Sequence, residues 1–179
     1  MSLIIGLDVS TSTIGLCIVD STIVLDDAGS HILLLDRIEL KKCETLWEKA
    51  DVVEQRLGGL TQTIDRVAIE EPLMGFRPGM SSAQTISTLM KFNGIVSYIA
   101  RNVFKRDPEY ISAAHARKLC GVKRQKTSVA GPQKEQVFRH MSQNDLKHVV
   151  WPTKKNGKLV DWSRDATDSY CIARAAMIE

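Results

Sequence analysis

The sequence predicts an α/β protein in which a mixed β-sheet is flanked by helices. Two short apolar runs, residues 3–9 and 14–20, are joined by the Ser/Thr-rich segment "STST" and predict an N-terminal β-hairpin. Strand and helix patterns then alternate along the chain, as in layered folds. A length of 179 residues with 44% hydrophobic residues is sufficient for one domain, residues 1–179, with a substantial core.

The first half of the chain supplies most of the predicted sheet. A third strand is expected over residues 31–40, after a turn that contains Asp and Gly. A helical pattern follows over residues 43–64, although Gly58-Gly59 weakens its second half. The segment "RVAIEEP", residues 66–72, predicts a buried strand that ends at Pro72.

The second half is predicted to be mainly helical. A long helix is expected over residues 82–105, where apolar residues recur on one side. A short strand at 109–112 and helices at 113–119 and 132–141 follow. The last helix is expected to begin at Ser163, a good N-cap residue, and to run to the end of the chain. Trp151 and Trp162 bracket the loop "WPTKKNGKLVDW" before it and are expected to anchor it.

The positive charge is concentrated in one region. Residues 115–164 contain twelve Lys or Arg against three Asp or Glu, whereas the rest of the chain contains twelve against eighteen. Such an asymmetry is typical of a surface that binds a polyanion, although a solvated polar loop region explains it as well.

Cysteine usage and hydropathy predict a reduced protein of the cytoplasm, or of the host cytoplasm if the chain is viral. No apolar run approaches the ~20 residues that span a bilayer. The first strand begins almost at Met1, which leaves no room for a signal peptide. The four cysteines are scattered without a C-x-x-C pair, so the sequence predicts neither a zinc site nor a disulfide framework.

Acidic residues end two of the predicted strands. Side chains alternate along a strand, so Asp8 shares a face with Ile4 and Gly6 in the first strand. Glu70 ends the apolar part of "RVAIEEP" in the same way. If the two strands are neighbours, Asp8 and Glu70 can lie side by side. An ionised carboxylate in a buried strand costs several kcal/mol unless a cation accompanies it, so either this strand lies on the surface or Asp8 has a cationic partner.

Two more acids lie near the start of the last helix. At about 100° per residue, Asp165 and Asp168 fall on one stripe of this helix. Four carboxylates from three separate elements suit a pair of Mg²⁺ or Mn²⁺ ions, and two such ions can activate phosphodiester hydrolysis. Taken singly, each acid also has a structural explanation, such as an ion pair with a buried Arg or a helix-start residue.

The ordered segments "IIGLDVSTSTIG", "VAIEE" and "DATDSYCIA" resemble the RuvC Holliday-junction resolvases of the RNase H-like nuclease superfamily. The segment "AHARKLCGV…GPQKEQVFRHM" is also similar to the family. The resemblance covers nearly the whole chain. It implies an RNase H-like fold with a five-stranded sheet, in which three antiparallel strands continue into parallel ones, and it implies a homodimer that makes paired nicks in a four-way junction.

The resemblance also assigns roles to residues. Asp8, Glu70, Asp165 and Asp168 match the family's metal-binding carboxylates, and Lys134 in "GPQKEQV" matches a lysine that stabilises charge at the scissile phosphate. The position of a second family lysine falls near Cys120, so Lys118 or Lys123 would have to replace it. Phe76 could replace a family aromatic residue near the junction crossover, where this chain has Leu73.

The favoured hypothesis is a metal-dependent endonuclease for branched DNA, either four-way junctions or, as in several viral relatives, forks. Its products would have 5′-phosphate and 3′-hydroxyl ends. Basic residues in two segments would bind the DNA backbone without base specificity. They are Arg117, Lys118, Lys123, Arg124 and Lys126 in the first segment, and Lys154, Lys155 and Lys158 in the second.

Two alternatives come from other functional classes. An ATP-binding module of the actin and sugar-kinase type begins with a similar "GLD-x-S-T" hairpin, but the sequence has neither its second phosphate motif nor its Gly-rich adenosine loop. A nucleotide-binding measurement separates this class from a nuclease. A catalytically silent junction-binding protein on the same fold would be favoured by the loss of a carboxylate, but all four acids are present.

Overall fold

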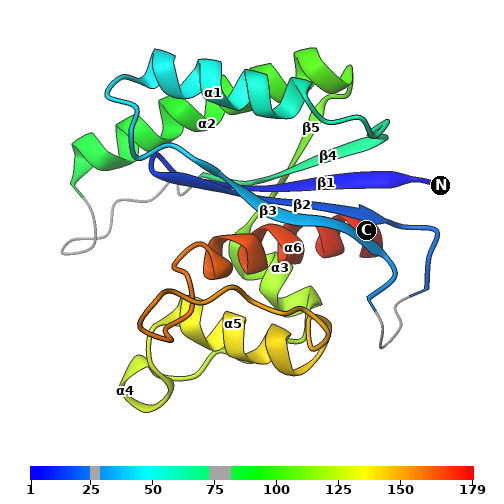
Figure 1. Cartoon of the computed structure of the whole chain (residues 1–179), viewed down its shortest axis with the longest axis vertical. Helices are drawn as coiled ribbons and strands as arrows, with labels where there is room; N and C mark the ends of the chain where they lie inside the picture. Colours follow the sequence, from blue (N-terminus) through cyan, green and yellow to red (C-terminus); the bar gives the residue numbers. More distant parts are fainter. Residues whose placement is uncertain (25–28, 73–81) are drawn as a thin grey trace.

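A computed structural model describes residues 1–24, 29–72 and 82–179, and in it a five-stranded sheet lies between two layers of helices (Figure 1). The strand order across the sheet is β3-β2-β1-β4-β5. The strands are β1 (Leu3–Val9), β2 (Thr13–Asp20), β3 (Ile32–Glu39), β4 (Arg66–Glu70) and β5 (Pro108–Ile111).

Strand directions confirm the predicted mixed sheet. β1, β2 and β3 form an antiparallel meander, whereas β4 pairs parallel with β1 and β5 pairs parallel with β4. The pairing of β1 with β4 includes Leu7 opposite Ile69. Asp8 and Glu70 follow these two residues directly, so the register of the sheet brings the two acids next to each other, on the face that the alternation of side chains predicts.

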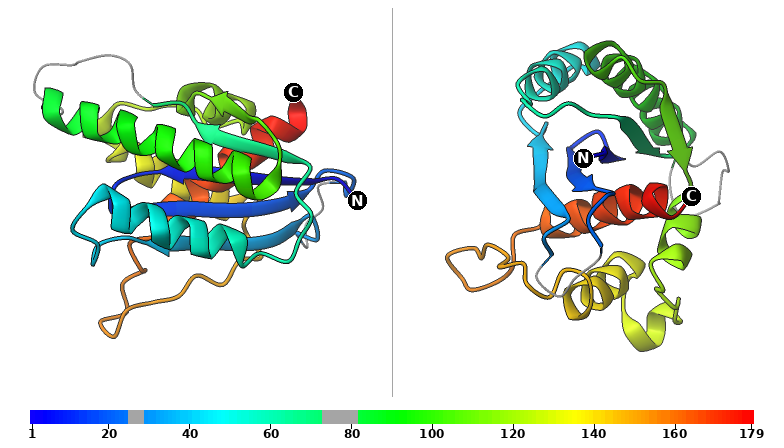
Figure 2. Two further views of the ribbon diagram at one scale, coloured as in Figure 1. Left: turned by 90° about the horizontal axis from the view of Figure 1, so that it is seen from above. Right: turned by 90° about the vertical axis from the view of Figure 1, so that its right-hand side faces the viewer.

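The helices divide into two layers, one on each face of the sheet (Figure 2). One layer contains α1 (Leu46–Gly58) and α2 (Ala83–Phe104), which cover an apolar core with Leu7, Ile69 and Phe92. The other layer contains α3 (Ala113–Leu119), α5 (Gln133–Gln143) and α6 (Ser163–Ile178), with the short α4 (Thr127–Ala130) beside them. Its core includes Ile4, Ala68 and Tyr170. Within the described residues, no helix is long and apolar enough to cross a membrane.

Two local predictions differ from the structure. Ser163 does not cap α6: Trp162 is the N-cap residue, and the Ser163 hydroxyl donates a hydrogen bond to the carbonyl oxygen of Val160 at 2.8 Å. The expected helix over residues 43–64 is shorter, because Thr45 caps its start by accepting a hydrogen bond from the Glu48 amide, and Gly58-Gly59 end it. The single-turn helix α4 was not predicted, since its segment has no apolar periodicity.

Two glycines allow α6 to pack directly on the sheet. A Cβ atom added to Gly6 of β1 would lie 2.7 Å from the amide nitrogen of Ala173. A Cβ atom added to Gly15 of β2 would overlap the carbonyl oxygen of Asp165. Glycine is therefore required at both positions for steric reasons, and the start of α6 is held against the strand that neighbours Asp8.

We expect Gly15→Ala to push the start of α6 away from the sheet. The overlap should lower the free energy of unfolding by about 1–3 kcal/mol, measured by urea denaturation. Gly58→Ala is the matched control, because an added Cβ meets nothing within 4 Å there and should stabilise the protein by about 0.5–1 kcal/mol. Equal effects of the two substitutions would contradict this account of the packing.

Candidate active site

The structure brings four acidic side chains together where β1, β4 and α6 meet. Asp8 and Glu70 come from the ends of adjacent strands, and the Glu70 carboxyl lies close enough to Asp8 to raise its pKa. Asp165 and Asp168 come from the first two turns of α6. Asp8 and Asp168 are almost completely buried, with 5% and 4% of their surface exposed. Carboxylates that are buried together repel one another, so cations must lie among them to offset the repulsion.

Lys134 of α5 supplies one of these cations. Its ammonium nitrogen lies 2.7 Å from Asp165 Oδ1, 3.5 Å from Asp8 Oδ2 and 3.7 Å from Asp168 Oδ2. Burial by itself lowers the pKa of Lys134, but the surrounding carboxylates outweigh burial and raise it. Lys134 therefore stays charged, and it joins β1, α5 and α6 electrostatically.

Arg117 of α3 supplies a second cation. Its guanidinium Nη2 donates a hydrogen bond of 3.0 Å to Asp168 Oδ1. Arg117 Nε and Asp168 Oδ2 are both buried, and no atom of the described residues makes a hydrogen bond with either. Sequence reasoning placed Arg117 on the DNA-facing surface and left its contact with Asp168 unpredicted, because the packing of α3 on α6 leaves no local signal.

Burial raises the pKa of both buried aspartates. For Asp8, the main cause is desolvation, and the neighbouring Glu70 adds to it. For Asp168, desolvation and the charge of Asp8 outweigh the opposing effects of Arg117 and Lys134. The acids are thus costly to ionise together, and perturbed pKa values of this kind are typical of functional sites.

The donor set fits a hard divalent cation. Mg²⁺ prefers carboxylate oxygens, and all four candidate ligands are carboxylates. Asp168 Oδ2 is a buried oxygen without a hydrogen-bond partner among the described residues, and the Lys134 ammonium lies between three of the carboxylates. Over residues 1–24, 29–72 and 82–179, however, no three His, Cys, Asp or Glu side chains are spaced as metal ligands in this arrangement.

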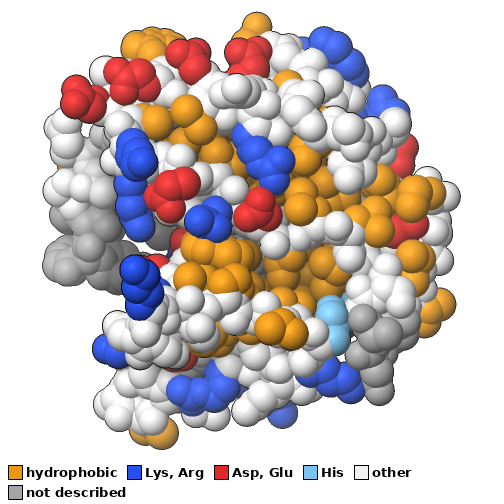
Figure 3. All heavy atoms as spheres, in the orientation of Figure 1, with side chains coloured by type: hydrophobic (Ala, Val, Ile, Leu, Met, Phe, Trp, Pro, Cys, Tyr) orange, Lys and Arg blue, Asp and Glu red, His pale blue; other side chains and the backbone are white. Residues whose placement is uncertain are grey.

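The other predicted DNA-binding residues of the first basic segment lie on α3 and directly after it. Lys118, Lys123, Arg124 and Lys126 are exposed on α3 and on the segment between α3 and α4. Lys123 lines a cavity of about 400 Å³ together with Arg139 and His140. In Figure 3, Lys and Arg side chains gather along the left edge of the molecule, around a hollow. No ion pair among the described residues joins Lys118 or Lys123 to the acids, so Arg117 is the basic residue that α3 brings there.

Two residues of the site carry no sequence signal. The Asn93 side chain of α2 donates a hydrogen bond of 3.0 Å to the carbonyl oxygen of Glu70, which fixes the end of β4. Arg37 of β3 lines the same cavity as Lys134 and Asp165. Its guanidinium packs on Trp162, with 4.5 Å between the guanidinium carbon and the ring centroid. Phe76, the predicted crossover residue, lies outside the described residues.

The chain is similar in structure to solved Holliday-junction resolvases. It aligns with RuvC of Thermus thermophilus in complex with a Holliday-junction substrate, with a TM-score of 0.60, 13% identity, and coverage of 99% of this chain and 94% of the other. A second structure of Thermus thermophilus RuvC gives a TM-score of 0.56 at 15% identity, with coverage of 98% and 93%. The chain has the RuvC fold.

The yeast mitochondrial Holliday-junction resolvase Ydc2 shares the RuvC fold with this chain, with a TM-score of 0.55, 13% identity, and coverage of 98% of this chain and 78% of the other. No protein-family model matches the sequence, and no curated protein matches it. The RuvC-like fold predicted from the three acidic segments is therefore confirmed by structural similarity. The sequence identity of 13–15% supports the fold and nothing further.

We expect Arg117→Ala to destabilise the protein, because it leaves Asp168 buried without its hydrogen-bonded cation. The loss should be about 3 kcal/mol in a urea denaturation experiment in EDTA, and Arg117→Ala/Asp168→Asn should recover most of it. Lys118→Ala, on the exposed side of the same helix, is the control and should change the stability by less than about 0.5 kcal/mol. A loss no larger than that of the control would refute the pairing.

Proposed function

We propose that this protein is a divalent-metal-dependent endonuclease that resolves Holliday junctions and related branched DNA. The observation that supports this proposal is the convergence, on a RuvC fold, of Asp8, Asp165 and Asp168 around Lys134, with Glu70 next to Asp8. The similar structures are those of a RuvC bound to a Holliday junction and of a mitochondrial Holliday-junction resolvase.

The four carboxylates are the proposed ligands of Mg²⁺ or Mn²⁺, with two ions per site. When bound, such ions activate water and stabilise negative charge on the phosphate oxygens, so that hydrolysis leaves 5′-phosphate and 3′-hydroxyl ends. Arg117 keeps one oxygen of Asp168 in a hydrogen bond and leaves Oδ2 free of hydrogen bonds from the described residues. Arg117 thus orients Asp168 as a ligand.

Lys134 has a second role in this scheme. Half of its side chain is exposed, and among the described residues its ammonium contacts only the carboxylates of Asp8, Asp165 and Asp168. With the carboxylates engaged as metal ligands, the Lys134 ammonium would be available to donate a hydrogen bond to an oxygen of the scissile phosphate, where it would stabilise the charge that develops during hydrolysis.

The basic segment of α3 and α4 is the proposed contact surface for the DNA backbone beside the acids. Its exposed members are Lys118, Lys123, Arg124 and Lys126. Contacts between lysine or arginine and phosphate give affinity without sequence preference, and that affinity falls steeply with salt.

We also propose that two copies of the chain pair through α2. Met90 and Tyr98 are 39% and 66% exposed on this helix, eight residues apart and therefore on one face. Gly94 lies midway between them, and a Cβ added there meets nothing within 4 Å. A glycine without an internal packing reason in the middle of a helix suits close approach by a second helix, and a dimer would present two sites to the two strands of a junction.

Asp8→Asn is expected to abolish cleavage of a four-way junction in Mg²⁺ or Mn²⁺, because it removes a ligand charge. Junction binding should persist, and the melting temperature in EDTA should rise by about 2–4 °C for each kcal/mol of repulsion removed. Cleavage of four-way, forked and linear DNA, with EDTA as the metal-free control, measures the first effect.

Glu70→Gln and Glu71→Gln form a matched pair for the same assay. The two residues are adjacent, but Glu71 is exposed and follows the end of β4. Glu70→Gln should abolish cleavage, and Glu71→Gln should leave it near the wild-type rate. Cleavage by Asp8→Asn or Glu70→Gln at the wild-type rate would rule out the proposed chemistry.

Tyr98→Arg should weaken the dimer, because it places a charge in an apolar interface. Sedimentation equilibrium over a range of protein concentrations should show a dissociation constant at least tenfold higher than that of the wild type, with an unchanged circular dichroism spectrum. Val150→Arg is the control, since Val150 is 93% exposed and lies in the other layer of the protein. A wild-type chain that stays monomeric would refute the dimer.

A further inference from the structure

Residues 152–160 form a closed β-hairpin rather than an irregular loop. Thr153 and Leu159 pair as an antiparallel bridge, and the amide of Lys154 donates a 2.7 Å hydrogen bond to the carbonyl oxygen of Lys158. The amide of Gly157 donates to the carbonyl oxygen of Lys154 at 2.9 Å, and Gly157 has a φ of +76°, which suits the bulge after a type I turn. We refer to residues 152–160 as the basic hairpin.

Aromatic contacts fix the base of the basic hairpin. Trp151 and Trp162, at its two ends, are in edge contact with 6.4 Å between ring centroids. Trp151 also contacts Phe138 of α5 at 5.3 Å, and Trp162 packs under Arg37 of β3. The hairpin is therefore fixed to α5 and β3, and α6 begins directly after Trp162, two residues before Asp165.

The tip of the basic hairpin has two unpaired positive charges. Lys154 is neutralised by Asp161, with 2.8 Å from its ammonium to each carboxylate oxygen. Lys155 and Lys158 are exposed, and neither takes part in an ion pair within the part of the chain that the structure describes. The rigid turn therefore presents two ammonium groups to solvent at a fixed place relative to Asp165.

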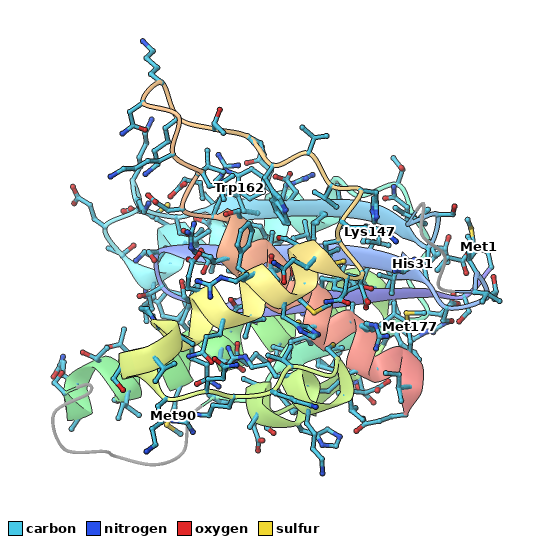
Figure 4. The ribbon with its side chains drawn as sticks, turned by 90° about the horizontal axis from the view of Figure 1, so that it is seen from below. Met1, His31, Met90, Lys147, Trp162 and Met177 are labelled. Atoms are coloured by element: carbon cyan, nitrogen blue, oxygen red, sulfur yellow. The ribbon has the colours of Figure 1, made fainter. Side chains whose placement is uncertain are left out.

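A groove leads from the acid cluster toward this hairpin. It has a volume of about 460 Å³, and its walls include residues of β3, of the hairpin and of the acid cluster: Arg37, Lys41, Lys134, Lys154, Trp162 and Asp165. Glu39 and Asp161 also line it and form ion pairs with Arg37, Lys41 and Lys154, so the unpaired positive charge comes from Lys155 and Lys158 at the hairpin tip. Figure 4 shows the hairpin beyond Trp162 on the side of β3, and Figure 2 shows α3 and α4 on the opposite side of α6. Basic surface thus lies on two separate sides of the acids.

We propose that the basic hairpin and the adjoining edge of β3 form a second binding surface for the DNA backbone, which holds a separate arm of a branched substrate. This inference rests on the proposed function. The α3–α4 segment and the hairpin flank the acids from opposite sides, so a substrate whose backbones diverge at the acids contacts both. A linear duplex that follows one side contacts only one of them.

The test compares Lys155→Ala/Lys158→Ala with the control Lys105→Asn/Arg106→Gln, two exposed residues that directly follow α2, each in the Asp8→Asn background. Asn is chosen for Lys105 because that residue has a φ of +57°. Binding of a four-way junction and of a linear duplex is measured by fluorescence anisotropy at several salt concentrations. We expect the hairpin variant to bind the junction about tenfold more weakly, with the slope of log K against log salt reduced by about 2, as for two lost phosphate contacts.

The linear duplex should lose less than about threefold in affinity, and the control should match its parent on both DNAs. Hydroxyl-radical footprints on the junction should show protection lost on one arm. If Asp8→Asn binds the junction tightly and the hairpin variant binds it with the same affinity and salt slope, the second binding surface is refuted and the proposed function is not. An equal loss on linear and branched DNA would overturn its assignment to a separate arm. Failure of the wild-type chain to bind or cleave a junction would instead refute the proposed function.

Discussion

The packing of α3, α5 and α6 against the sheet depends on the repulsion between four carboxylates that lie close together. Asp8 and Asp168 are buried, and burial raises the pKa of each. Two cations from different elements offset this cost: Lys134 from α5 and Arg117 from α3. Because each cation must reach the acids, the positions of α3 and α5 beneath the sheet are set by electrostatics as well as by apolar packing.

The two faces of the sheet differ in how their helices pack on the strands. The face covered by α1 and α2 is a conventional apolar core, with buried Val, Leu, Ile and Phe side chains. The other face packs α6 onto the strands so closely that Gly6 and Gly15 are required. Both faces therefore bury an apolar core, but only the face that packs on α6 also contains a cluster of buried charge. The Asn93 side chain of α2 donates a hydrogen bond to the carbonyl oxygen of Glu70 at the end of β4, and so connects the helices on one face to the acid cluster on the other.

Much of the fold and the positions of the acids could be predicted from the sequence, because their signals are local. The alternation of apolar residues around Asp8 and Glu70 gives their face, and the helical spacing of Asp165 and Asp168 gives their stripe. The contact of Arg117 with Asp168 and the groove beside Arg37 could not be predicted, since they arise from packing between elements distant in sequence. Ser163 shows the limit of local rules: a good capping residue lies inside the helix, and its hydroxyl bonds backward to Val160.

The tryptophan contact at the base of residues 152–160 has a consequence for how such a protein can diversify. Trp151 and Trp162 close the segment at its root, so what lies between them can change in length or charge while the start of α6 stays in place. Under the proposed function, insertions between the two tryptophans would change which DNA shapes are bound and would leave the acidic residues of α6 in place.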